Sequence, residues 1–217
     1  MQNSLAEKFL TKLKAEVTRI YKNGADKQSL GQPINDFHRN RCCALLADHG
    51  GTLITGNSNA PRDKNLTPTI ILNPSLDAQV MKEEIFGPIL PVLTYKTMQE
   101  AVDTINSMDK PLGIYYFGKN SYSNKNLKKL RDETSSGAFL VNEIAMHFFN
   151  ADTPFGGVGG SGYGRCHGKE GFMQCSNQKS VIYKSPMNFW PFTVTIPPFT
   201  SDKQRMIRFL MTTMDYN

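Results

Sequence analysis

The chain has 217 residues and a formal net charge of +6, from 25 Lys and Arg against 19 Asp and Glu. Hydrophobic residues account for 39% of it, and with 17 glycines the apolar share is that of an ordinary globular protein. These values exclude a disordered, collagenous or coiled-coil chain, and they allow one or two domains with a buried core.

The N-terminal residues predict an amphipathic helix. Residues Ser4 to Glu7 have the spacing of a capping box. Apolar residues then follow at the helical period: Leu5, Phe9, Leu10, Leu13, Val17 and Ile20. Asn23-Gly24 is expected to end this helix. Because nothing precedes such a one-sided helix in the chain, we expect its apolar face to be uncovered.

A second helix and a short strand are predicted next. The helix is expected over Ile34 to His49. Its inward residues are expected to be Phe37, Cys42, Leu45 and Leu46. Thr52 to Thr55 follow as a strand, and the polar run Gly56 to Asn65 as an exposed loop.

From residue 68 the sequence alternates between strand and helix patterns. Strands are expected over Thr69–Leu72, Ile89–Tyr95, Leu112–Phe117 and Gly137–Val141. Helices are expected over residues 97–108, after a capping box at Thr97 to Glu100, and over Tyr122–Thr134. This order predicts an α/β fold with an open, mostly parallel twisted sheet and flanking helices. The strand Leu112–Phe117 is apolar throughout, so we expect it to be buried on both faces.

A glycine-rich segment and a proline-containing tail complete the chain. Residues 156–168 contain a GxGxxG pattern, but neither the preceding strand nor the later acid of a dinucleotide fingerprint accompanies it, so we expect a tight loop. A short helix over Lys169–Gln174 and a strand over Ser180–Tyr183 are predicted next. The tail from Ser185 is expected to be extended and to wrap a surface. Its apolar end, Ile207–Met214, predicts a packed or frayed terminal helix, with a weak membrane-surface contact as the alternative.

Four cysteines without CxxC spacing predict neither a disulfide framework nor a metal site. Reduced thiols, no apolar leader and no run of about 18 apolar residues favour a cytoplasmic protein. A basic nucleic-acid-binding module would rest on Lys119, Lys125, Lys128, Lys129 and Arg131. Asp132 and Glu133 follow directly, so a solvated helix face is the better interpretation, and we expect no nucleic-acid partner.

Two motifs carry a specific resemblance. The segments EEIFGPILPV, residues 83–92, and PFGGVGGSGYGRCHGKEGF, residues 154–172, resemble the NAD(P)-dependent aldehyde dehydrogenase family. SSGAFLVN at 135–142 and QKSVIYK at 178–184 are similar to it in order and spacing. The resemblance implies the C-terminal part of an aldehyde dehydrogenase domain over residues 1–184 and a proline-containing extended tail over residues 185–217. The tail most resembles the branch that acts on aliphatic and aromatic aldehydes.

The resemblance implies site residues and partners. Glu84 matches a glutamate that hydrogen-bonds the nicotinamide ribose, and Phe86 matches an aromatic against the nicotinamide side of NAD or NADP. Phe155 matches an aromatic of the aldehyde pocket, and Met146 to Phe149 match the wall of the substrate tunnel. The strand Ser180–Tyr183 matches an oligomerisation strand, which implies a homo- or hetero-dimer.

The resemblance also implies that catalytic parts are missing. In the family a cysteine thiolate attacks the aldehyde, hydride passes to the nicotinamide, and a glutamate activates the water that releases the acid. That cysteine, that glutamate and the nucleotide-binding domain precede the EEIFGP motif, so we expect a partial chain that is inactive alone and binds the cofactor poorly. A non-catalytic partner of a full-length aldehyde dehydrogenase is the alternative. Cys166-His167, beside the glycine loop, is the remaining thiol candidate, although the motif places nothing catalytic there.

Overall fold

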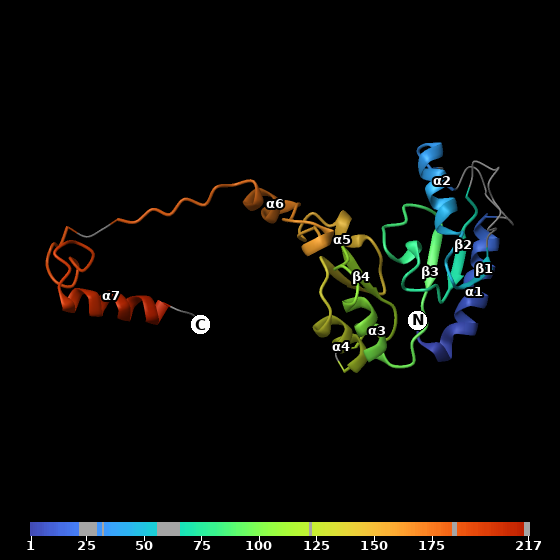
Figure 1. The fold of residues 1–217 in the computed structure, drawn as a ribbon, viewed down its shortest axis with the longest axis horizontal. Coiled ribbons are helices and arrows are strands. Elements are labelled where there is room, and N and C mark those ends of the chain that lie inside the picture. The colour runs from blue at the N-terminus through green and yellow to red at the C-terminus, as the bar shows by residue number, and fades with distance from the viewer. Residues whose placement is uncertain (22–29, 32, 56–65, 122, 184–185, 215–217) are drawn as a thin grey trace. The chain divides into compact units, whose positions relative to one another are not determined.

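The computed structural model describes residues 1–21, 30–31, 33–55, 66–121, 123–183 and 186–214. It divides into two compact units, Met1–Cys175 and Ser176–Asn217. The first unit contains two small α/β layers, and Figure 1 shows their helices and strands in chain order. The predicted loop over residues 56–65, the predicted helix end at residues 23–24 and the predicted domain boundary at residues 184 and 185 lie outside the described residues.

The N-terminal segment is anchored by main-chain bonds. The Asn3 amide donates to the Tyr95 carbonyl at 2.8 Å, and the Tyr95 amide donates to the Met1 carbonyl at 2.9 Å. A 3-10 turn over Asn3–Leu5 therefore leads into helix α1, Ala6–Tyr21, and Ser4 lies inside this turn. The expectation of an uncovered helix is wrong in part, because Leu10 of α1 packs against Ile70 and Val92 of the three-stranded sheet. Figure 1 shows α1 beside this sheet. Other apolar residues of this segment are exposed: Leu5, Phe9 and Ile20.

The first sheet has the order β1-β2-β3, with β1 Thr52–Thr55, β2 Thr69–Leu72 and β3 Ile89–Val92. Strand β1 is antiparallel to β2, whereas β2 and β3 are parallel and pair Thr69 with Ile89. Because side chains alternate along a strand, Ile70 joins the cluster under α1 and Ile71 joins the cluster under α2.

Helix α2, Asp36–Leu45, is shorter than the predicted 34–49 helix. The Asn35 side chain accepts a hydrogen bond from the His38 amide at 3.0 Å, which fixes the start. Cys42, Leu45 and Leu46 are buried as expected. Phe37 is 72% exposed, which corrects the prediction, because it lies in the first turn of the helix and outside the core cluster.

The second layer packs α3, Met98–Asn106, and α4, Lys125–Glu133, with two parallel strands, β4, Gly113–Tyr116, and β5, Ala138–Val141. The centre of its core is Val102, Ile114 and Leu130. Strand β4 is not buried on both faces in this chain, since Ile114 is buried while Tyr115 is exposed. At the strand ends, Asn142 accepts from the Gly118 amide at 2.8 Å and donates to the Gly118 carbonyl at 2.9 Å.

The remaining elements of the first unit are short, and the second unit contains a longer helix, α7, Ser201–Met214. The short elements are the 3-10 turns η2, Gln79–Met81, and η3, Gly159–Ser161, and the helices α5, Met146–Phe149, and α6, Gly168–Gln174. The α/β class is confirmed, but the described strands form two small sheets instead of one open sheet. Residues 180–183 pair with no strand of the described chain, and α7 shows that the tail is not extended throughout. No helix in the described ranges is long and apolar enough to span a membrane.

Candidate functional site

The turn Glu83–Gly87 lies directly before β3. The Thr69 amide of β2 donates to the Pro88 carbonyl at 2.8 Å, and the Ile89 amide donates to the Gly87 carbonyl at 2.8 Å. These bonds join the end of the turn to the parallel pair β2-β3. The turn is therefore held at the amino ends of β2 and β3.

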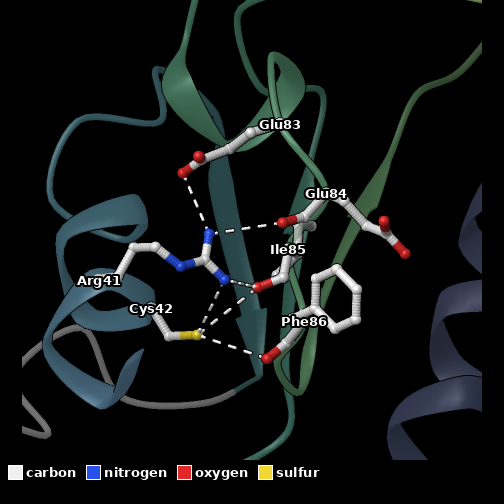
Figure 2. Close-up of polar contacts among 6 residues, drawn as sticks. All are labelled: Arg41, Cys42, Glu83, Glu84, Ile85 and Phe86. Atoms are coloured by element: carbon white, nitrogen blue, oxygen red, sulfur yellow. Dashed lines mark hydrogen bonds and ion pairs between the residues drawn. The ribbon is translucent and has the colours of Figure 1, made fainter. Parts of the chain in front are cut away.

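Arg41 of α2 holds the turn from the other side (Figure 2). Its Nη1 donates to the Glu83 carboxylate at 3.1 Å and to the Glu84 carbonyl at 3.4 Å. Its Nη2 donates to the Ile85 carbonyl. One guanidinium thus contacts three successive residues of the turn, as the fixed fork of five donors allows.

Cys42 lies beneath the same turn and is 0% exposed. Its Sγ lies 3.7 Å from the Ile85 carbonyl oxygen and 3.8 Å from that of Phe86. Burial raises the pKa of the Cys42 thiol above its usual value of 9.0, although the Arg41 charge acts in the opposite direction. Cys42 is therefore a neutral packing thiol, as its mid-helix position predicts.

Glu84 and Phe86 are presented outward by this arrangement. Figure 2 shows the Glu84 carboxylate directed away from Arg41, whereas the Glu83 carboxylate is directed toward it. The Phe86 ring is 77% exposed, and Phe86 has a φ of 45°, which is unusual for a bulky residue. Within the described residues, no hydrogen bond or ion pair engages the Glu84 carboxylate. A free carboxylate and an exposed ring two residues apart suit a ligand with vicinal hydroxyls beside a flat ring.

Phe155 lies in a second group of residues, here called the aromatic cluster: His147, Phe148, Phe155 and His167. The Phe155 ring is stacked on His167, with 5.6 Å between centroids, and lies 5.2 Å from the His147 ring. Phe148 meets Phe155 edge-on at 5.3 Å. The structure therefore places Phe155 beside α5, in a cluster separate from the Glu83–Gly87 turn.

The aromatic cluster also accounts for Cys166 and His167. Phe155 and Cys166 exchange main-chain hydrogen bonds of 3.0 and 2.8 Å, and the Cys166 thiol lies 3.3 Å from the Phe155 carbonyl oxygen. His167 contacts the Phe155 ring instead of the neighbouring thiol. Cys166 and His167 thus both contact Phe155 and hold it in place.

Comparison with known proteins places these motifs in a family. Residues 1–181 match the aldehyde dehydrogenase family. The chain belongs to the aldehyde dehydrogenase family. Aldehyde dehydrogenase family 3 member H1 of Arabidopsis thaliana is 35% identical over 213 residues, which is 95% of this chain and 42% of that protein. Family 3 member B1 of Homo sapiens is 37% identical over 206 residues, with 94% and 42% covered.

Solved aldehyde dehydrogenase structures have the same fold. The substrate-bound Staphylococcus aureus AldH matches with a TM-score of 0.76 and 31% identity, over 96% of this chain and 45% of that one. A betaine aldehyde dehydrogenase variant from the same organism, in complex with NAD+, matches with a TM-score of 0.65 and 26% identity, over 85% and 40%. The chain therefore spans less than half the length of these aldehyde dehydrogenases.

The sequence motif drew attention to Glu84 and Phe86 of the turn but not to Arg41, which holds the turn from α2. The sequence offers only a weak indication of Arg41. It is a basic residue next to a helix position that is expected to be buried, and it precedes the pair Glu83 and Glu84 by 42 residues. Spacing in the sequence cannot show that this cation and those acids meet.

Proposed function

We propose that this aldehyde dehydrogenase chain contributes the nicotinamide-ribose contacts and part of the aldehyde pocket to NAD(P)-dependent oxidation of an aldehyde to a carboxylic acid. The observation that carries the proposal is the different surroundings of two adjacent glutamates. Glu83 is paired with Arg41, and Glu84 is left to solvent beside the exposed Phe86 ring.

Each named residue has a distinct task in this proposal. The Glu84 carboxylate accepts hydrogen bonds from the two ribose hydroxyls, and the Phe86 ring packs against the nicotinamide side. Phe155 and its ring partners keep the aldehyde in a dry, apolar environment. The dinucleotide, when bound, supplies the hydride acceptor. None of these residues supplies the nucleophilic thiolate of the proposed reaction. Cys42 is fully buried, and the Cys166 thiol lies 3.3 Å from the Phe155 carbonyl oxygen.

A paired form of the chain is proposed from one exposed segment. Val181, Ile182 and Tyr183 are all exposed, in a stretch that pairs with no strand among the residues that the structure describes. An apolar, unpaired stretch of this kind suits addition to the sheet edge of a second aldehyde dehydrogenase subunit, of this or a full-length chain. We further propose a cytoplasmic location with weak membrane-surface contact at α7, where Phe209 and Met211 are exposed. Sedimentation of the wild type and of Ile182→Lys tests the pairing, which the lysine should weaken.

Nuclear magnetic resonance titration tests the cofactor contact. Amide signals of residues 83–87 should shift on addition of NAD+, NADP+ or nicotinamide mononucleotide, with dissociation constants on the order of 1 mM or weaker. Glu84→Gln should weaken this binding about tenfold, because a hydrogen bond to a charged group is worth roughly 1.5–3 kcal/mol.

Glu7→Gln is the matched control, since Glu7 is an exposed glutamate in the first turn of α1. It should leave the titration unchanged. Equal affinity of the wild type and Glu84→Gln, or no shift in residues 83–87, would refute the proposed contact.

A further inference from the structure

We propose that Arg41 and Cys42 are positioning residues, which hold the Glu83–Gly87 turn against α2 so that Glu84 and Phe86 are presented to the nicotinamide ribose. We call these two residues and the turn the Arg41 clamp. The identity of the ligand rests on the proposed function, but the clamp itself rests on contacts within the described chain.

The clamp is built from two neighbouring helix residues that contact four successive turn residues. Arg41 bonds the Glu83 carboxylate and the carbonyls of Glu84 and Ile85. The Cys42 thiol lies near the carbonyls of Ile85 and Phe86. These contacts engage the Glu83 side chain and the main-chain carbonyls from Glu84 to Phe86. They therefore hold the turn around Glu84 without touching its carboxylate (Figure 2).

Close packing beneath the turn limits its movement. A Cβ atom added at Gly87 would lie 2.6 Å from the Cys42 Sγ, so the glycine backbone rests directly on the thiol. The turn therefore cannot shift inward, and any outward shift would uncover a thiol that is now fully buried. Exposure of Cys42 is thus a direct measure of whether the turn is in place.

The conformation of Phe86 explains why a clamp is needed. A bulky residue with positive φ is strained and persists only where its surroundings fix it. Contacts to the carbonyls of Ile85 and Phe86 act on the two peptide groups that flank this φ angle. Without Arg41, Phe86 would be free to return to an ordinary conformation, and its ring would leave the proposed nicotinamide side.

Arg41 also separates the two acids. Its ion pair with Glu83 is partly shielded, with 22% of the Arg41 side chain and 47% of the Glu83 side chain exposed. If Arg41 were removed, two free carboxylates would compete at the site and repel each other. The clamp thereby commits the Glu83 carboxylate to Arg41 and leaves the Glu84 carboxylate for the ligand.

Thiol labelling of the full chain tests the clamp. In the wild type, 5,5'-dithiobis(2-nitrobenzoic acid) should modify the exposed Cys166 and Cys175 quickly and Cys42 slowly, with each site followed by peptide mass spectrometry. Arg41→Ala should accelerate labelling of Cys42 at least about tenfold, which corresponds to roughly 1.4 kcal/mol of easier opening. Arg41→Lys should give an intermediate rate, because an ammonium group lacks the planar fork.

Two further variants keep the experiment decisive if Arg41→Ala folds poorly. Glu83→Gln removes the ion pair but leaves the carbonyl bonds, so it should raise the Cys42 rate less than Arg41→Ala does. Arg19→Ala is the matched control, because Arg19 makes an exposed ion pair with Glu16 on α1. It should leave the Cys42 rate unchanged. An unchanged Cys42 rate in both Arg41 variants would overturn the clamp.

A ligand measurement distinguishes positioning from simple stability. Arg41→Ala should weaken nicotinamide mononucleotide binding although Glu84 and Phe86 are intact, and Arg41→Lys should restore part of it. Glu84→Gln should weaken the same binding while Cys42 labelling stays at the wild-type rate. Accelerated labelling with unchanged ligand affinity would overturn the positioning role. If the wild type binds no nicotinamide mononucleotide, the proposed function fails, while the labelling rates still decide the clamp.

Discussion

The Arg41 clamp and the aromatic cluster position proposed ligand contacts in opposite ways. The clamp relies on one guanidinium and one buried thiol that contact main-chain carbonyls. The aromatic cluster relies on rings, and three of its imidazole nitrogens are buried without a hydrogen-bond partner among the described residues: Nδ1 and Nε2 of His147 and Nδ1 of His167.

This difference indicates which substitutions should disturb each site most. Loss of a single residue removes several bonds of the clamp at once. In the aromatic cluster each ring contributes about 0.5–1.5 kcal/mol beyond its buried area, so the loss of one ring leaves the others in place. The weak point of the cluster is instead the backbone on which it is built. Each site also contains a closely packed glycine, Gly87 in the clamp and Gly137 next to the backbone that carries Phe155.

The largest effect is expected behind the aromatic cluster. A Cβ at Gly137 would collide with the Gly156 carbonyl oxygen and lie 2.6 Å from the Leu112 carbonyl oxygen. Both obstacles are main chain, which cannot rotate away as a side chain can. Gly137→Ala should therefore destabilise the chain by about 3 kcal/mol, measured as a lower midpoint of urea unfolding.

Gly31→Ala is the control for this change, since no heavy atom of the described residues lies within 4 Å of a Cβ placed there. It should leave the midpoint where it is. If Gly137→Ala unfolds at the wild-type urea concentration, the close approach of residues 137 and 156 is wrong.

A smaller effect is expected in the clamp. Gly87→Ala places its Cβ against the Cys42 Sγ, a side-chain atom with some freedom to move, and should cost about 1–2 kcal/mol. Cys42→Ala removes that atom, so the double variant should lose less stability than the sum of the two single changes. Urea unfolding of all four proteins measures the coupling, and additive losses would show that the two residues do not touch.

The smallest effect is a dependence on alkaline pH. Burial raises the pKa of the Cys42 thiol, so the folded chain holds this proton more tightly than the unfolded chain does. Its contribution to stability is complete below the usual thiol pKa of 9.0 and is lost as the pH rises through the folded pKa. The urea midpoint of the wild type should therefore fall more steeply than that of Cys42→Ala between about pH 8 and pH 10.

Comparison with Cys42→Ala is necessary because Tyr95 responds in the same direction. Burial raises the pKa of Tyr95 above 10.0, so this phenol also costs stability at higher pH in both proteins. Parallel pH profiles of the wild type and Cys42→Ala would contradict a buried neutral thiol at residue 42.

Sequence periodicity predicted the elements that are fixed by local patterns. Helix α3 starts where expected, with Thr97 accepting from the Glu100 amide at 3.3 Å. In a capping box the Glu100 carboxylate would accept a hydrogen bond from the Thr97 amide. Here it accepts from the amide of the preceding residue, Lys96, at 2.9 Å. All five strands of the two sheets were also expected, within a few residues at their ends.

Pairing and burial were less accessible to the sequence, because they depend on contacts between distant segments. Nothing in Thr52–Thr55 shows that this strand runs antiparallel to β2. The apolar run around β4 indicated burial on both faces, yet Phe117 is 64% exposed in this chain. For the proposed site, the motif pointed to Glu84 and Phe86. The contact of their turn with Arg41 depends on how α2 packs against the turn, which the sequence does not show.

Asn142 has a consequence that its sequence position does not suggest. Its side-chain amide donates to and accepts from the main chain of one residue, Gly118, just beyond the last β4-β5 pair, Tyr116 and Val141. The β4-β5 pair is thus extended by one rung made from a side chain. Conversion of this amide to a carboxylate, whether by mutation or by spontaneous deamidation, would replace the donor with a negative charge facing the Gly118 carbonyl. Deamidation of Asn142 would therefore weaken the β4-β5 pair at the end from which the chain continues to α5 and Phe155.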